Sequence, residues 1–174
     1  MEFSILAIIL VLVVAFLAGM ESILDQFQFH QPIIACSLIG LATGHLSEGI
    51  ILGGSLQMIA LGWANVGAAI APDAALASVA SAIIMVLGLE GGTTNVQTAI
   101  STSIAVAIPL SVAGLFLTMI CRTIAIPMVH LMDSAAEKGN IRAMETWQIL
   151  AILLQGVRIA IPAAALCIVP ATVV

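Results

Sequence analysis

Long apolar runs separated by short polar stretches dominate the chain. The first run extends from Phe3 to Met20, interrupted only by Ser4, and a second extends from Pro32 to Leu46. Later runs fill most of Thr98–Cys121 and Trp147–Val174. A helix needs about 20 apolar residues to cross a bilayer, whereas strands of a membrane barrel alternate polar and apolar residues. The pattern therefore predicts an all-α, polytopic membrane protein.

The apolar stretch Ile50–Leu89 is too long for one crossing and is broken internally. Glycine in a helix interior costs about 1 kcal/mol relative to alanine, and proline about 3 kcal/mol. We therefore predict a half-helix over 50–61, an irregular segment over 62–72 and a second helix over 74–88, with Asp73 at the N-cap. The residues that break the stretch are Gly53, Gly54, Gly62, Gly67 and Pro72. Such interruptions predict broken or re-entrant helices.

The second half of the chain predicts a turn at Glu90–Asn95 and then the span Thr98–Cys121, with kinks at Pro109 and Gly114. An amphipathic helix follows over Thr123–Lys138. Gly139 and Asn140 end this helix. The segment Ile141–Thr146 then leads into the last apolar run. Basic residues mark the cytoplasmic side of a membrane protein, and three of the four gather here, so we expect this hairpin to be cytoplasmic. They are Arg122, Lys138 and Arg142.

Composition supports the membrane assignment. Hydrophobic residues make up 62% of the 174 residues, charged residues 7%, and the mean hydropathy is +1.25. Soluble domains are about 25% charged, so this chain suits a lipid bilayer. A net charge of −5 excludes a nucleic-acid partner. We interpret 1–174 as a single membrane domain, and because it ends within an apolar run we expect further C-terminal spans.

The irregular segment is the first candidate binding site. Non-helical backbone at membrane depth persists only where protein buries it or where it lines a cavity, and transporters bind substrates at broken helices. Gln57 and Asn65 offer amide donors and acceptors, Asp73 is an acceptor, and Trp63 can stack on a sugar face. The alternatives are structural. The two amides can bridge helices, Asp73 can be only a cap, and Trp63 can be an interface anchor.

A second polar patch, Glu21–Gln31, contains Asp25 and is either part of the site or a solvated loop. Other chemistry finds no support in the residue pattern. The histidines and cysteines are scattered, so neither a metal site nor another cofactor is predicted. Arg158, inside the last apolar run, needs a carboxylate or a cavity. Glu145 and Glu48 are possible partners.

Three segments resemble the IIC subunits of mannose/fructose/sorbose-family phosphotransferase systems. The signature is Leu52–Ala77, and Gly19–His30 and Leu154–Pro162 match the same family. The resemblance covers nearly the whole chain, although Glu90–Thr102 carries no shared motif. It is in that segment that we expect specificity for a ligand or partner to differ among members.

The resemblance implies a sugar-translocating subunit of a phosphoenolpyruvate-dependent system that imports mannose- or glucose-type hexoses. It implies a IID membrane partner, a cytoplasmic IIAB phosphoryl donor and a higher oligomer of IIC–IID pairs. The phosphohistidines belong to the partners, so the chain itself is not an enzyme. Carried over by motif, the sugar contacts are Gln57, Asn65 and Asp73, followed by Trp63 and Asp25.

Two other hypotheses remain open. Some members of this family look like docking receptors for membrane-active bacteriocin peptides, a role that can coexist with transport. The third hypothesis is an intramembrane enzyme that uses Asp25, Asp73 or His45 in acid–base chemistry. No pair of these has a spacing that one helix would bring together, so the sequence favours transport.

Overall fold

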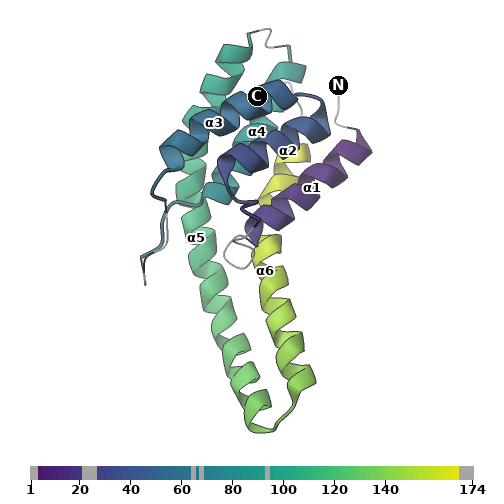
Figure 1. Ribbon diagram of the computed structural model, residues 1–174, viewed down its shortest axis with the longest axis vertical. Helices are drawn as coiled ribbons and strands as arrows, with labels where there is room; N and C mark the ends of the chain where they lie inside the picture. The colour runs from purple at the N-terminus through teal and green to yellow at the C-terminus, as the bar shows by residue number, and fades with distance from the viewer. Residues whose placement is uncertain (1–3, 21–26, 64–65, 67–68, 93–94, 169–174) are drawn as a thin grey trace.

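The structure, a computed structural model, describes residues 4–20, 27–63, 66, 69–92 and 95–168. Its regular elements in these ranges are six helices, which confirms the all-α prediction (Figure 1). They are α1 (Ile5–Gly19), α2 (Pro32–Thr43), α3 (Leu46–Ala60), α4 (Ala74–Glu90), α5 (Val96–Glu137) and α6 (Ile141–Ile168).

Two long helices and four short ones make up the architecture. Helices α5 and α6 form a long hairpin, and the short helices pack together around the end of it away from its tip (Figure 1). By length and apolarity, α5 and α6 are the described helices that can cross a membrane. The others have 12 to 17 residues, or about 18–26 Å at 1.5 Å per residue, which is less than the ~30 Å hydrocarbon layer. A short helix placed in the hydrocarbon layer therefore has at least one end within that layer.

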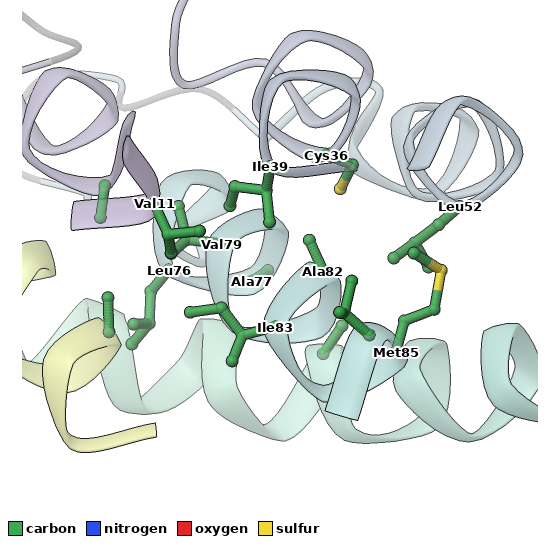
Figure 2. Close-up of a cluster of buried hydrophobic side chains, with 14 of the residues drawn as sticks. Val11, Cys36, Ile39, Leu52, Leu76, Ala77, Val79, Ala82, Ile83 and Met85 are labelled. Carbon is green, nitrogen blue, oxygen red and sulfur yellow. The ribbon is translucent and has the colours of Figure 1, made fainter. Parts of the chain in front are cut away.

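Helix α4 is the centre of the packed end. Its residues from Ala75 to Gly88 are all buried, because α1, α2, α3, α5 and α6 all contact it. Figure 2 shows Val11 of α1, Ile39 of α2 and Leu52 of α3 directed toward the buried side chains of α4. A helix that is apolar on all sides is expected at such a position.

The predicted helices exist, but several boundaries differ. Helix α2 ends at Thr43, because Gly44 adopts a left-handed conformation (φ 83°), and α3 starts at Leu46 where the prediction had 50. The two predicted helices on either side of Arg122 are one continuous helix, α5. An arginine removes no backbone donor, so it does not stop a helix. Likewise α6 is continuous from Ile141, with no separate lead-in segment.

Candidate functional site

The end of α1 and the start of α4 meet the middle of α6. At the end of α1, a Cβ added to Gly19 would lie 2.6 Å from the carbonyl oxygen of Gln155, so α1 and α6 touch through their backbones. At the start of α4, the carboxylate of Asp73 forms an ion pair with Arg158, one turn further along α6. The end of α1 and the start of α4 therefore lie at one level of the molecule.

The start of α2 and the end of α3 belong to the same region. The Cys36 thiol, in the second turn of α2, donates to the carbonyl of Ser78 in the second turn of α4 (3.4 Å), so these two helices begin side by side. Gln57, in the last turn of α3, bonds to the first residues of α2. We call this level, where α1 and α3 end and α2 and α4 begin, the polar layer. Its polar side chains are Gln28, His30, Gln31, Gln57, Asp73, Thr118 and Arg158.

An amide network ties α3 to the start of α2. Gln57 Oε1 accepts from the backbone N–H of Ile33 (3.3 Å), and Gln57 Nε2 donates to Gln31 Oε1 (2.6 Å). Gln31 Nε2 in turn donates to Gln28 Oε1 (3.1 Å) and lies 3.2 Å from His30 Nε2. Gln57 thus supplies the side-chain cap that Gln31, at the N-cap of α2, does not supply to its own helix. These side chains are half-buried, and none is an acid.

A charged network holds the start of α4. Asp73 Oδ1 accepts from the N–H of Leu76 (2.9 Å), which confirms the predicted N-cap. Asp73 Oδ2 accepts from the Arg158 guanidinium and from the hydroxyl of Thr118 (3.2 Å). Arg158 also donates to the Thr118 hydroxyl oxygen (2.7 Å). The side chains of Arg158 and Asp73 are only 3% and 2% exposed, so this network is closed to solvent.

Helix α5 is shaped to receive Asp73. The backbone N–H of Asp73 donates to the carbonyl of Ser111 (2.9 Å). One turn further on, a Cβ at Gly114 would lie 2.5 Å from Asp73 Cβ, so only glycine fits this approach. Thr118 follows one more turn along the same face. Residues at 111, 114 and 118 share one face of a helix, and together they form a cradle for Asp73, the N-cap residue of α4.

The structure corrects the predicted partner of Arg158. A carboxylate partner is confirmed, but it is Asp73, and neither Glu145 nor Glu48 occupies that position. Glu145 is 13 residues away on the same helix, about 20 Å at 1.5 Å per residue. Glu48 lies in the first turn of α3, whereas it is the last turn of that helix that reaches the polar layer. Asp73 was considered only as a cap or a sugar contact, because sequence spacing does not show which helices pack together.

The other predicted site residues fall into three groups. Gln57 belongs to the amide network and bonds to Gln31, whereas Asp73 belongs to the charged network and bonds to Arg158. The two predicted sugar contacts therefore lie in separate hydrogen-bond networks. Trp63 is half-buried and packs against the core, close after the end of α3. Asn65 and Asp25 lie outside the described residues. The sequence analysis did not single out Thr118 or Ser111. The pattern that could have identified Thr118 is a polar residue one turn after Gly114, on the face where that glycine permits close packing.

The polar layer is suited to a neutral, hydroxyl-rich ligand. Two helices begin there, and helix N-termini carry partial positive charge. Non-helical backbone adjoins them at 61–63 and 69–73, with the single bridge Val66–Ala69 between. Amide side chains can both donate and accept. Among the described residues, no three His, Cys, Asp or Glu side chains gather in a way that could hold a metal ion.

Short helices that end around a polar layer beside two long apolar helices define a helical membrane transport component of the broken-helix class. The family follows from comparison with known proteins. A family model described as the sorbose-specific IIC component of phosphotransferase systems matches residues 5–174. The chain therefore belongs to this family of phosphotransferase membrane components, as the sequence motifs predicted.

Named relatives agree. The chain is 50% identical to the mannose-specific EIIC component of Escherichia coli K12 over 94% of its own length and 58% of the relative's. It is 46% identical to the sorbose-specific EIIC component of Klebsiella pneumoniae and 45% identical to the fructose permease IIC component of Bacillus subtilis 168. These alignments cover 94% and 91% of the chain, and 58% and 56% of the relatives. The chain thus spans less than two thirds of the length of these relatives.

A solved structure has the same fold. It is the complex of the mannose transporter ManYZ with microcin E492, and one of its chains aligns with a TM-score of 0.87 at 49% identity. The match covers 96% of this chain and 64% of that one. At this identity the likeness extends beyond fold class to the helix-by-helix arrangement described above.

Proposed function

We propose that this chain forms the sugar-translocating part of a IIC subunit of a mannose-type phosphotransferase system. The observation that carries the proposal is the polar layer, where α1 and α3 end, α2 and α4 begin, and non-helical backbone lies next to amide side chains. Transporters with broken helices bind substrates at such places. The substrate class is a hexose of the mannose or glucose type, in keeping with relatives named for mannose, sorbose and fructose.

The proposed sugar contacts are Gln57, Asn65, Trp63 and Asp25, with Asp73 fixing the end of the irregular segment. Gln57 is the described residue that best fits the role. Its amide is half-buried and can exchange its bond to Gln31 for bonds to sugar hydroxyls. Trp63, a few residues on, offers a flat apolar surface.

The proposed system needs partners. A IID subunit completes the membrane part, oligomers of IIC–IID pairs form the transporter, and a cytoplasmic IIAB protein phosphorylates the incoming sugar at the expense of phosphoenolpyruvate. The chain then crosses the bacterial cytoplasmic membrane several times. The tip of the α5–α6 hairpin faces the cytoplasm, because Lys138 and Arg142 are exposed there.

Uptake of labelled hexose tests the proposal. The full-length subunit is expressed with IID and IIAB partners in cells that lack their own mannose transporter. We expect mannose or glucose uptake that needs all partners and that is lost in Asn65→Ala and strongly reduced in Gln57→Ala, while the membrane complex still assembles. Ser55→Ala is the matched control, because Ser55 is exposed on α3 and its hydroxyl donates to the carbonyl of Ile51 in its own helix. An assembled wild-type complex that takes up no hexose would refute the proposal.

A second function, docking of a bacteriocin peptide, is favoured by the neighbouring structure that contains microcin E492. The segment 90–102, which lacks a shared motif, has exposed residues at the end of α4 and the start of α5. Exchanging Glu90–Thr102 for the corresponding segment of a relative is expected to change killing by the peptide without abolishing sugar uptake. Unchanged peptide sensitivity would exclude this segment from the docking surface.

A further inference from the structure

Arg158 has an unusual position for a cation. It lies within the last apolar run, its side chain is 3% exposed, and in the described part of the chain its carboxylate partner is Asp73. An arginine at membrane depth is costly unless it is paired or reaches water. The pair is therefore either a site for ligand or a device that holds helices in place, and the hydrogen bonds of Asp73 distinguish the two.

The protein itself occupies the bonding groups at Asp73 that could face a ligand. Oδ1 caps Leu76, and Oδ2 accepts from Thr118 and Arg158. The backbone N–H is bonded to Ser111. With a side chain only 2% exposed, the carboxylate could reach a sugar only after this network came apart. Its geometry is that of a structural anchor.

We propose that Arg158 is a positioning residue of the transporter. It neutralises Asp73, which holds the start of α4 in the cradle of α5 and thereby fixes the end of the irregular segment that leads from Trp63 to Asp73. Neither member of the pair contacts the sugar. This inference rests on the proposed transport function, and it assigns the pair to the scaffold while leaving Gln57 as the sugar contact.

The charges are dispensable if they are removed together. Removing one member of a buried pair strands the other charge, whereas replacing both with neutral groups is often tolerated. The pair is also incompletely satisfied, since Arg158 Nε has no hydrogen-bond partner among the described residues. Asparagine at 73 would still cap α4 through Oδ1, because asparagine is a good N-cap residue. Its Nδ2 amide would then donate to the Thr118 hydroxyl oxygen, where Asp73 Oδ2 now accepts.

A double-mutant cycle tests the inference, with Asp73→Asn, Arg158→Leu and the combination measured in the full-length subunit with its partners. Each single change strands a buried charge, so we expect the assembled membrane complex to fall by about tenfold or more. In the double variant we expect assembly to recover to within about threefold of wild type, with the KM for hexose uptake also within about threefold. Arg122→Leu is the control, because Arg122 is an exposed arginine of α5.

Three outcomes would overturn the inference. The first is a double variant that assembles but shows no saturable sugar uptake, which would make the pair a direct sugar contact. The second is a double variant that assembles no better than the worse single variant, because then charge neutralisation is not the role of Arg158. The third comes from Arg158→Lys, which keeps the charge. It is expected to assemble and keep its KM, so a KM raised tenfold or more in an assembled complex would indicate sugar contact.

The design also separates this inference from the proposed function. Assembly of the complex is measured without sugar, so recovery in the double variant is informative even if no hexose is transported. Failure of the wild-type complex to take up any hexose would refute transport and leave the anchoring role of the pair intact.

Discussion

The two networks of the polar layer differ in charge and in access to solvent. The amide network around Gln57 is neutral and partly open, and each of its bonds joins groups that could bond equally well to hydroxyls. The Asp73–Thr118–Arg158 network is charged, buried and closed. A transporter must release its ligand, so weak, exchangeable amide bonds suit a binding surface. A buried ion pair, which is costly to open, suits an anchor.

The contrast also shows how one broken stretch of sequence can serve both purposes. Gln57 stands before the irregular segment and Asp73 at its end, 16 residues apart. Charged side chains fix the start of α4 to α5 and α6. Between α3 and the start of α2, the side-chain amides of Gln57 and Gln31 lie beside a close backbone contact at Gly53, so the helices stay packed when the amides exchange their bonds. Variants in the charged network should therefore affect folding first, and variants in the amide network should affect transport first.

The largest effect is expected from filling the space at Gly114. A Cβ there would lie 2.5 Å from Asp73 Cβ and 3.2 Å from Leu76 Cβ, so Gly114→Val forces α4 away from α5. Overpacking of this kind costs about 1–3 kcal/mol or more, and it opens the ion pair as well. We expect almost no assembled complex by size-exclusion chromatography.

Gly54→Ala, a smaller substitution at a helical glycine with room for a side chain, is the control for that variant. Gly54 is also a helical glycine, but the nearest atom to an added Cβ is the flexible end of Ile33 at 3.9 Å. Its complex is expected to assemble normally. If Gly114→Val assembled as well as Gly54→Ala, the close approach of Asp73 to α5 would be wrong.

The next effect should come from Thr118→Val, which keeps the shape of the side chain and removes its hydroxyl. Asp73 and Arg158 would each lose one hydrogen bond in a buried site. Such a loss costs about 1–3 kcal/mol, so thermal unfolding of the purified complex is expected at a lower temperature. Thr123→Val is the control, because Thr123 is exposed on α5 and its hydroxyl donates to the Met119 carbonyl of the same helix. Equal unfolding temperatures for the two variants would contradict a role for Thr118 in the charged network.

A smaller effect on stability, with a large one on transport, is expected from Gln57→Glu. The carboxylate can still accept from Ile33 at the start of α2, where a negative charge is favourable by about 0.3–1 kcal/mol, but it cannot donate to Gln31. Assembly should therefore be close to normal, while hexose uptake falls because one amide donor is missing. Uptake at the wild-type rate in an assembled Gln57→Glu complex would remove Gln57 from the sugar site.

The sequence predicted the helices and the location of the break better than it predicted their neighbours. Local rules were sufficient for the N-cap at Asp73 and for the irregular backbone before it, because both depend on adjacent residues. The partner of Arg158 depends on how α4, α5 and α6 pack, and the chain separates Asp73 from Arg158 by 85 residues. The continuity of α5 across Arg122 was also missed, because a polar residue after an apolar run was read as the end of the span, although an arginine removes no backbone hydrogen bond.

The smallest effect is expected from Ser111→Ala, and its small size is informative. The group of Ser111 that holds Asp73 is its backbone carbonyl, whereas its hydroxyl bonds to the carbonyl of Ile108 in its own helix (2.6 Å). Alanine keeps the backbone contact and favours the helix, so stability should change by about 0.5 kcal/mol or less. Thermal unfolding of the purified complex and the KM for hexose should both stay near wild type. A loss as large as that of Thr118→Val would mean that the Ser111 hydroxyl takes part in the charged network, and the anchor would then extend one turn further along α5.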